Sequence, residues 1–348
     1  MATAMTGDVW AGIGWHMVGA ALAASFYAPI EKVRKWSWET TWAIAGVFSW
    51  ILLPISVSLI LLPHFAMFYA STAPAVLVKV ALFGAMWGIG NISYGLTMRH
   101  LGISLGVGVA IGVTLVVGTL VPPLLHGQAA VLFGTRPGLL TVAGVLVALT
   151  GVAIVTYAGH QKERELCGEP TEFNLRLGIL LAILCGIFSS GMSFAIDAAQ
   201  PMQAAALRAG VNHLYAALPS YVFIMGGGAV VNLGYCFVRL AALKRLSIRA
   251  DFRLPGKTLV RNATLAACGG IMWYLQFFFY AWGQASIPAR LAYANWMLHM
   301  SGYVLFAGIV GLLMGEWAGV TSRPIRLLLA GMAVIILAAN MVGLGLAS

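Results

Sequence analysis

Ten runs of apolar residues, each about 20 residues long, occupy most of the sequence. A helix of this length crosses the hydrocarbon core of a bilayer, where a spanning segment must satisfy its own backbone hydrogen bonds. Turn residues and charges separate the runs, and we place the predicted spans at 8–30, 42–62, 75–98, 103–125, 138–158, 176–199, 214–240, 260–285, 290–315 and 325–346. Hydrophobic residues make up 61% of the chain and charged residues 9%, which excludes a water-soluble domain. The sequence therefore predicts an all-α membrane protein with ten transmembrane helices.

Prolines and glycines indicate where these helices bend and where they touch. Pro54 and Pro219 lie inside predicted spans, so we expect each to kink its helix because a proline has no N–H to donate. Gly84 and Gly88 follow each other by one helical turn, a spacing that is typical of close contact between membrane helices.

Lysine and arginine are distributed unevenly between the two ends of the spans. Sixteen lie at the ends of odd-numbered spans and in the loops that follow them, and three lie in the loops after even-numbered spans, with Lys79 near a span end left aside. Because positive residues are retained on the cytoplasmic side, both termini are predicted to be extracytoplasmic. The net charge of +10 then reflects orientation in membrane lipid, and we expect no nucleic-acid partner.

The chain divides into two parts with the same number of predicted spans. Five spans in residues 1–158 precede a polar cytoplasmic linker at 159–175, and five follow in residues 176–348. A repeat with an odd number of spans places its two copies in opposite orientation. A Met-Trp-x6-Tyr skeleton that begins at Met86 recurs at Met272, which favours a 5+5 inverted repeat around a shared midplane site. The alternative is that two aromatic membrane helices resemble each other by chance.

The most distinctive segments of the chain are the strings FGAMWGIGNISYGLTMRHLG, KVRKWSWET, LPSYVFIMGGG and GGIMWYLQFFFYAWGQASIPA. With these strings the chain resembles the L-rhamnose/proton symporter family, a branch of the drug/metabolite transporter superfamily. The resemblance extends over nearly the whole length. It implies the drug/metabolite transporter fold in a bacterial inner membrane. It also implies uptake of L-rhamnose or a related 6-deoxy sugar by alternating access, with the proton as coupling ion and no other cofactor.

The chain departs from this family at two positions. The resemblance implies an acidic residue near Ala292 and an amide at Asp197, whereas here the acid is at Asp197 and the other position is alanine. The proton-coupling residue of the family therefore does not transfer directly to this chain.

A sugar requires hydrogen-bonding groups for its hydroxyls and flat apolar surfaces for its C–H faces. Polar and aromatic side chains that lie well inside predicted spans offer both. The candidate substrate-binding residues are Trp87, Asn91, Tyr94, Ser189, Ser193, Trp273, Gln276, Tyr280, Asn295 and His299. Aromatic residues also form belts at the membrane surface, which is the alternative for some of them.

Three ionisable side chains inside predicted spans are candidates for proton coupling, because such groups are costly in a bilayer and mark pathways and proton relays. They are His16, Asp197 and His299. Helical spacing places His16 on one face with Tyr27, and Asp197 on one face with Ser189 and Ser193. The alternatives are a histidine that a neighbouring helix satisfies, and a carboxylate that is solvated at a helix end.

Two other classes of function are alternatives, intramembrane enzymes and carriers of a different metabolite. An intramembrane enzyme needs clustered carboxylates for a metal or a paired nucleophile and base, and no DxxD or HExxH occurs in any predicted span. We therefore expect no enzymatic activity and no metal. An exporter or facilitator of another small polar metabolite on the same fold stays open, since fold alone does not decide function.

Overall fold

A computed structural model of the chain describes residues 9–101, 103–166, 174–242 and 248–347, and all regular structure in these residues is helical. The elements of the first part are α1 (Val9–Ser25), α2 (Tyr27–Glu31), α3 (Trp38–Gly46), η1 (Val47–Leu52), α4 (Leu53–Leu61), α5 (Phe65–Ser71), α6 (Pro74–Leu101), α7 (Ile103–Leu125), α8 (Ala129–Gly134) and α9 (Arg136–Leu166). Those of the second part are α10 (Leu175–Ser189), α11 (Gly191–Ala198), α12 (Gln200–Arg208), η2 (His213–Tyr215), η3 (Leu218–Ser220), α13 (Tyr221–Ala242), α14 (Ile248–Phe252), α15 (Gly256–Ser286), η4 (Ala289–Leu291), α16 (Ala294–Leu313) and α17 (Ser322–Ala347).

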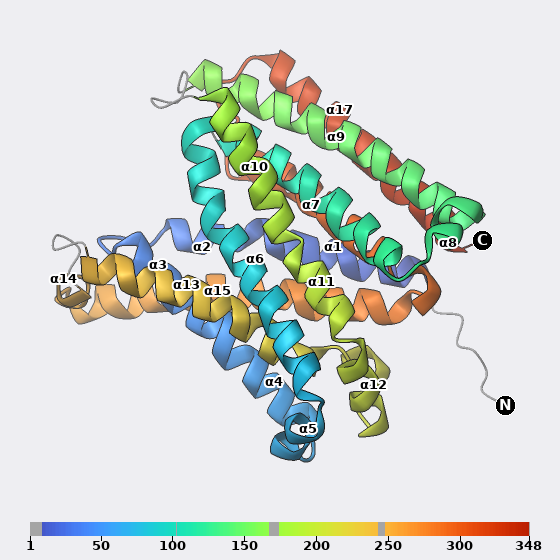
Figure 1. The fold of residues 1–348 in the computed structure, drawn as a ribbon. Helices are drawn as coiled ribbons and strands as arrows, with labels where there is room; N and C mark the ends of the chain where they lie inside the picture. Colours follow the sequence, from blue (N-terminus) through green and yellow to red (C-terminus); the bar gives the residue numbers. More distant parts are fainter. Residues whose placement is uncertain (1–8, 102, 167–173, 243–247, 348) are drawn as a thin grey trace.

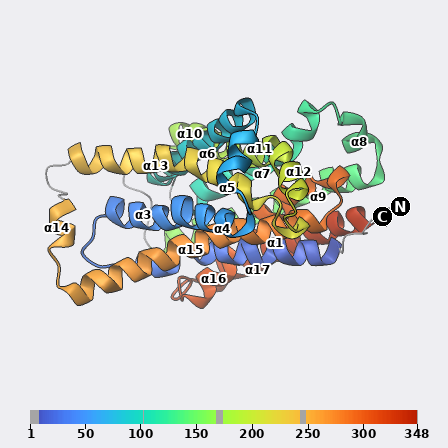
Figure 2. The ribbon, with the colours of Figure 1, turned by 90° about the horizontal axis from the view of Figure 1, so that it is seen from below.

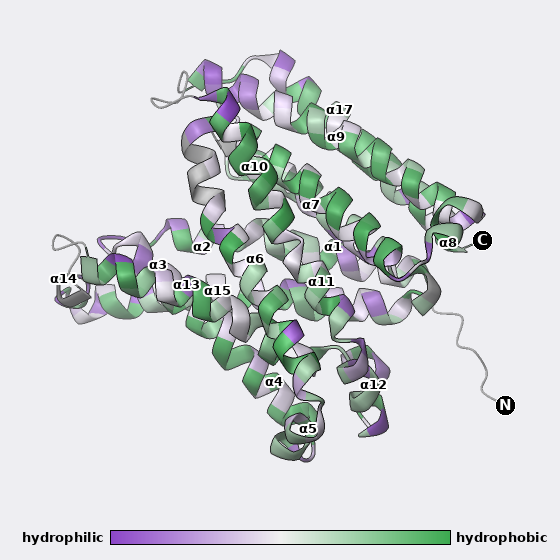
Figure 3. Cartoon of the chain, in the orientation of Figure 1, coloured by the Kyte–Doolittle hydropathy of each residue, from purple (hydrophilic) through white to green (hydrophobic). Residues whose placement is uncertain are grey.

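Ten segments of the described chain are helical, long and apolar enough to cross a membrane, which confirms the predicted ten-span architecture. They are Val9–Glu31, Trp38–Leu61, Pro74–Ser93, Leu105–Leu125, Arg136–Leu166, Leu175–Arg208, His213–Ala242, Gly256–Ser286, Ala294–Leu313 and Ser322–Ala347. The helix middles are apolar, while polar residues gather at helix ends and in loops (Figure 3). The fifth and sixth spans are longer than predicted, because each helix continues past the end of its apolar run.

The two internal prolines coincide with interruptions of regular α-helix, as predicted. Pro54 lies in the first turn of α4, directly after the π-helix η1, and Pro219 lies within the 3-10 helix η3. A proline removes one N–H donor from the helical ladder, and a local π or 3-10 turn accommodates the loss.

Two long helices, α6 and α15, lie at the centre of the packing (Figures 1 and 2). Helix α6 packs against α10, α11 and α13, and α15 packs against α1 and α3. Helix α16 packs against α1, α7 and α17, and α9 lies along α17. The ends of α3, α13 and α15 extend together away from the remaining helices, with α14 between them (Figures 1 and 2).

Glycines set the closest approaches of α6 and α15. A Cβ at Gly84 of α6 would collide with the backbone carbonyl oxygen of Ile224 in α13, and a Cβ at Gly88 would lie 3.0 Å from the carbonyl oxygen of Gly228. This confirms the predicted close contact. In the same way, a Cβ at Gly270 of α15 would collide with the carbonyl oxygen of Ala45 in α3.

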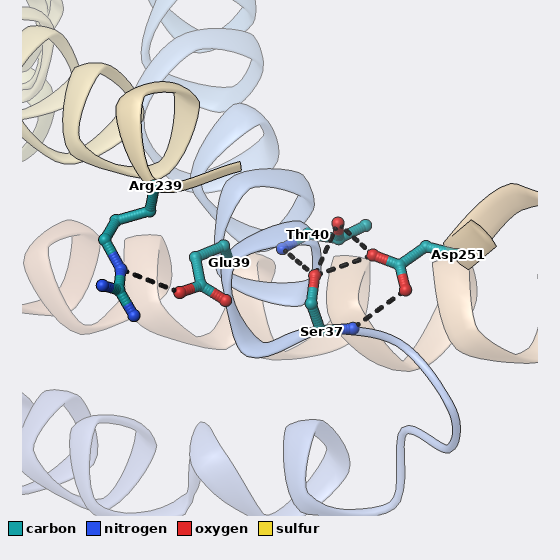
Figure 4. Close-up of polar contacts among 5 residues, drawn as sticks. All are labelled: Ser37, Glu39, Thr40, Arg239 and Asp251. Carbon is teal, nitrogen blue, oxygen red and sulfur yellow. Dashed lines mark hydrogen bonds and ion pairs between the residues drawn. The ribbon is translucent and has the colours of Figure 1, made fainter. Parts of the chain in front are cut away.

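A buried carboxylate ties α14 to the start of α3 (Figure 4). Both oxygens of Asp251 accept hydrogen bonds: Oδ1 from the backbone N–H of Ser37 at 3.1 Å, and Oδ2 from the hydroxyls of Ser37 at 2.7 Å and Thr40 at 2.6 Å. Ser37 is also the N-cap of α3. Beside this contact, Arg239 at the end of α13 approaches Glu39 at 3.4 Å. These contacts join the beginning of the second span to the end of the seventh, which sequence reasoning did not anticipate.

Candidate functional site

The candidate site centres on a contact between α6 and α15, to which each helix contributes a tryptophan. Trp87 and Trp273 stack with ring centroids 6.4 Å apart and an interplanar angle of 16°. The Phe277 ring lies edge-on to both indoles, at 6.1 Å from Trp87 and 6.3 Å from Trp273. Gly228 of α13 makes room for Trp87, because a Cβ there would lie 2.6 Å from the indole ring. The recurring Met-Trp skeleton thus brings two aromatic surfaces together inside the bundle.

Amide and indole groups around these rings have unused hydrogen-bond donors. Asn91 follows Trp87 by one helical turn, and its buried Nδ2 has no hydrogen-bond partner. The Nε1 of Trp273 and the Nε2 of Gln276 are likewise buried and unpaired. An unpaired buried donor costs about 1 to 3 kcal/mol. These three side chains therefore have hydrogen-bonding capacity that no described residue fills.

Gln276 belongs to a buried cluster of five polar side chains from three helices. His16 of α1 lies 2.7 Å through Nε2 from Asn295 Oδ1 of α16, and His299 of α16 lies 3.5 Å through Nε2 from Gln276 Oε1 of α15. The Tyr280 ring lies 4.9 Å from the His16 ring and 5.2 Å from the His299 ring. All five residues are at most 3% exposed. The structure therefore brings together the predicted residues of spans one, eight and nine.

Two glycines allow α1 to approach α15 closely enough to form this cluster. A Cβ at Gly19 of α1 would lie 2.7 Å from the carbonyl oxygen of Gln276, and a Cβ at Gly283 of α15 would lie 2.7 Å from His16 Nε2. Small residues in these positions are what permits polar side chains of separate membrane helices to meet.

The amide of Asn295 defines which nitrogen of His16 carries a hydrogen. Asn295 Nδ2 donates to the carbonyl of Ala292 at 2.9 Å, which directs Oδ1 toward His16. An amide oxygen only accepts, so His16 Nε2 carries the hydrogen and Nδ1 of the neutral ring is a bare acceptor. His16 Nδ1 is buried without a partner, as is Nδ1 of His299.

The two imidazoles are close to each other, and neither has an ion-pair partner in the described chain. Their ring centroids lie 6.1 Å apart. In the described chain, no carboxylate, lysine or arginine forms an ion pair with either ring. Two positive charges at this separation would repel each other by about 3 kcal/mol at an effective dielectric constant of about 20.

Asp197 lies at the end of α11, outside this cluster. Its Oδ2 lies 2.7 Å from Nε2 of His126, in the loop after α7, and its Oδ1 accepts from Gln200 Nε2 at 2.8 Å. The side chains of Asp197 and His126 are 26% and 51% exposed. Asp197 is thus paired at a partly solvated helix end.

The polar residues of span six contact different neighbouring helices. The helix is interrupted at Ser190, between α10 and α11. Ser189 lies against Gly90 of α6, whereas the hydroxyl of Ser193 donates to the carbonyl of Gly118 in α7 at 2.6 Å. These two serines and Asp197 therefore contact different neighbours, and their roles in binding stay predictions.

Two further sequence expectations have different outcomes. His16 and Tyr27 do not border one site, because Tyr27 is 44% exposed while His16 is buried. The side chain of Tyr94 lies outside the described part of the structure, so its role stays a prediction.

Sequence reasoning missed three side chains near the site. Phe277 follows Trp273 by the same spacing as Asn91 follows Trp87, and this spacing was a usable signal. Trp296 lies 6.1 Å from the Tyr280 ring and donates to the carbonyl of Thr114 at 2.9 Å, a contact that no local pattern indicates. The third is His126, the partner of Asp197.

Sequence comparisons with known proteins identify the family of the chain. A sequence model of the family described as L-rhamnose-proton symport protein (RhaT) matches residues 5–348. The chain belongs to this family. It is 60% identical over 344 residues to the L-rhamnose-proton symporter of Cronobacter sakazakii, with 99% of this chain and 100% of the relative covered. It is 60% identical over 343 residues to that of Pectobacterium atrosepticum and 59% over 344 to that of Yersinia pestis, each with 99% and 100% covered.

Membership of the L-rhamnose-proton symport family confirms the resemblance that the sequence indicated. The names of the family and of these relatives are those of transporters, which agrees with the prediction that the chain is not an enzyme. At the position where the resemblance implies an acid, this chain uses the backbone of Ala292 to orient Asn295.

Proposed function

We propose that this chain is a secondary active transporter that takes up L-rhamnose, or a closely related 6-deoxy sugar, together with a proton. Relatives that carry the name L-rhamnose-proton symporter and match the chain over nearly its full length support the substrate. The observation that carries the proposal is the site itself: two buried imidazoles without a countercharge lie beside stacked indoles and unpaired amide donors. These are the groups that a proton and a sugar require.

The sugar binds between α6 and α15. The indoles of Trp87 and Trp273 provide flat apolar surfaces for C–H faces, and the free donors of Asn91 and Gln276 bind hydroxyl oxygens from the two halves. Further contacts are assigned to Tyr94, Ser189, Ser193, Tyr280, Asn295 and His299.

The two parts of the chain form a 5+5 inverted repeat with the drug/metabolite transporter fold, comprising residues 1–158 and 176–348 on either side of the linker 159–175. Helix contacts support this, because they occur in matching pairs: α6 with α10 and α15 with α1, α6 with α13 and α15 with α3, α7 with α9 and α16 with α17. The equivalent collisions of a Cβ at Gly84 and at Gly270 with the backbone of the neighbouring helix support it further. Such repeats exchange access to a central site by moving one part against the other.

The protein lies in the bacterial inner membrane with both termini extracytoplasmic. The uneven distribution of lysine and arginine supports this orientation. A reporter that is active only in the cytoplasm should stay silent when it is fused after Ser348, and an active reporter would overturn the orientation.

Proton coupling is assigned first to His16 and His299, because both are fully buried and lie next to the proposed sugar contacts. Asp197 remains a proposed coupling residue in second place, since its carboxylate is partly exposed and already bonded to His126 and Gln200.

Uptake of labelled L-rhamnose into vesicles with an imposed pH gradient tests the function. Accumulation that follows an inward proton gradient and collapses with a protonophore is expected. Equilibration without accumulation would instead identify a facilitator, and sugar efflux driven by proton entry would identify an exporter.

A further inference from the structure

We infer that His16 and His299 together hold one proton in the sugar-bound state, and that Gln276 links this proton to the sugar. The inference rests on the proposed function and specifies how many protons move and through which residue they act on the substrate. Three features of the buried cluster carry it: a bare nitrogen that can accept a proton, no charged group among the described neighbours that would stabilise a second proton, and the Gln276 amide, whose oxygen approaches His299 and whose nitrogen is unpaired.

The capacity to take up a proton follows from the tautomer of His16. Asn295 is fixed by its bond to the carbonyl of Ala292, so its oxygen accepts from His16 Nε2, and His16 Nδ1 is left as a buried lone pair without a donor. His299 presents a second unpaired Nδ1 in the same cluster. A proton that enters the cluster therefore finds an acceptor.

The limit of one proton follows from what surrounds the two rings. Helix α15 contributes Tyr280, Gln276 and Gly283, α16 contributes Asn295, with Tyr303 one turn beyond His299, and α1 places Gly19 near the His299 ring. In the described residues, none of these neighbours carries a charge. A buried charge is tolerated when it is paired, and here the partner available to a protonated imidazole is its neutral neighbour 6.1 Å away. A second proton would place two like charges at this distance without compensation.

Gln276 is the link between the proton and the sugar because its amide oxygen approaches His299 while its amide nitrogen is left without a partner. Its oxygen lies 3.5 Å from His299 Nε2, a long contact for a neutral imidazole, while its nitrogen is buried and unpaired. When His299 is protonated, its N–H becomes a charged donor and holds the amide oxygen more strongly. The amide nitrogen is then fixed for a hydroxyl oxygen of the sugar. By reciprocity, a bound sugar that fixes the amide favours the protonated pair.

One proton therefore enters from the external medium with each sugar molecule and leaves when the sugar is released inside. The proton moves between water and the bare imidazole nitrogen, and no covalent step is required.

Isothermal titration calorimetry of the purified full-length protein with L-rhamnose tests the inference directly. Repeating the titration in buffers of different ionisation enthalpy gives the number of protons taken up per sugar. The protein should take up one proton per sugar, and a variant with both His16→Gln and His299→Gln should take up none. His213→Gln, at an exposed histidine on η2, is the matched control and should behave as the parent protein.

Gln276→Glu provides a second route that does not depend on the double variant folding. A carboxylate next to His299 would keep the pair protonated before sugar arrives, so proton uptake per bound sugar should be near zero, while the affinity for sugar should fall because the Nε2 donor is lost. Two protons per sugar in the parent protein, or one proton retained in the double variant, would overturn the shared proton. No binding heat with L-rhamnose in the parent protein would overturn the proposed substrate instead.

Discussion

The His16–His299 pair and the Asp197–His126 pair are titratable sites of opposite construction. The first is buried, carries no countercharge and lies next to unpaired donors at the aromatic contact. The second combines opposite charges when His126 is protonated, and water reaches both side chains. An exposed ion pair exchanges protons with little effect on its surroundings, whereas a charge that appears in the buried pair alters every polar contact around it.

Asp251 shows that burial alone does not make a coupling site. This carboxylate is 6% exposed, yet both of its oxygens are bonded to the backbone and hydroxyl donors of Ser37 and Thr40. These donors already bond both oxygens of the Asp251 carboxylate. What distinguishes the histidine pair is burial together with unfilled hydrogen-bonding capacity, the combination that lets the protonation state respond to a ligand.

The largest effect is expected when the buried pair is removed. An imposed gradient of one pH unit supports up to about tenfold accumulation with one coupled proton, because a tenfold concentration ratio stores about 1.4 kcal/mol. The variant carrying His16→Gln and His299→Gln should equilibrate labelled L-rhamnose without accumulating it. Exchange of sugar across the membrane should persist, and accumulation by this variant at the parent level would place coupling elsewhere.

Removing the satisfied buried carboxylate should affect stability rather than coupling. Asp251→Ala leaves the donors of Ser37 and Thr40 unpaired and removes hydrogen bonds to a charged group, each worth about 1.5 to 3 kcal/mol. Thermal unfolding in detergent should show a clear loss of stability, while proteins that fold should still accumulate sugar. Glu316→Ala is the control, because Glu316 forms a pair with Lys162 at the surface and is 51% exposed. Equal stability of the two variants would contradict the structural role of Asp251.

Asn91→Ala and Gln276→Ala test whether the sugar lies beside the buried pair. Each should weaken L-rhamnose binding by about 1 to 3 kcal/mol, or about 5- to 150-fold, because a hydroxyl loses its partner in a dry site. Tryptophan fluorescence on titration with sugar measures this, since Trp87 and Trp273 line the contact. Asn340→Ala is the control, as its amide faces the exposed side of α17 and bonds only to the carbonyl of Ile336 among the described residues. Unchanged affinity in both test variants would remove α6 and α15 from the site.

The smallest effect is expected at the surface pair. Asp197→Asn and His126→Gln should each change stability by less than about 1 kcal/mol, in a manner that salt reduces. Both variants should accumulate sugar as the parent does. Should Asp197→Asn abolish accumulation and spare exchange, the carboxylate and not the histidine pair would hold the coupling proton.

Much of the architecture was predictable from the sequence because lipid imposes a simple rule on it. Each span has to be long and apolar, so ten runs gave ten helices, and Pro54 and Pro219 marked the interruptions. The residues of the candidate site were found for a related reason. Amides and imidazoles are conspicuous inside apolar helices, which singled out His16 and Asn295 before their contact was known.

The partners of these residues could not be predicted, because side-chain contacts between helices depend on packing over long separations. His16 and Asn295 lie 279 residues apart in sequence, and Ser37 and Asp251 lie 214 apart. Helical spacing likewise placed Ser189 and Ser193 on one face, but it could not predict that Ser189 lies against α6 while Ser193 bonds to α7. Local periodicity therefore identifies candidates, while packing decides which of them meet.

Proton movement that accompanies sugar entry is the most direct test that the buried pair holds the coupling proton. L-rhamnose is added to lightly buffered vesicles that contain the protein and have no imposed gradient, and a pH electrode follows the external medium. The parent protein and Asp197→Asn should make the medium more alkaline, while the His16→Gln and His299→Gln variant should admit sugar without a pH change. An alkaline shift of parent size in the histidine variant, or its loss in Asp197→Asn, would contradict this assignment.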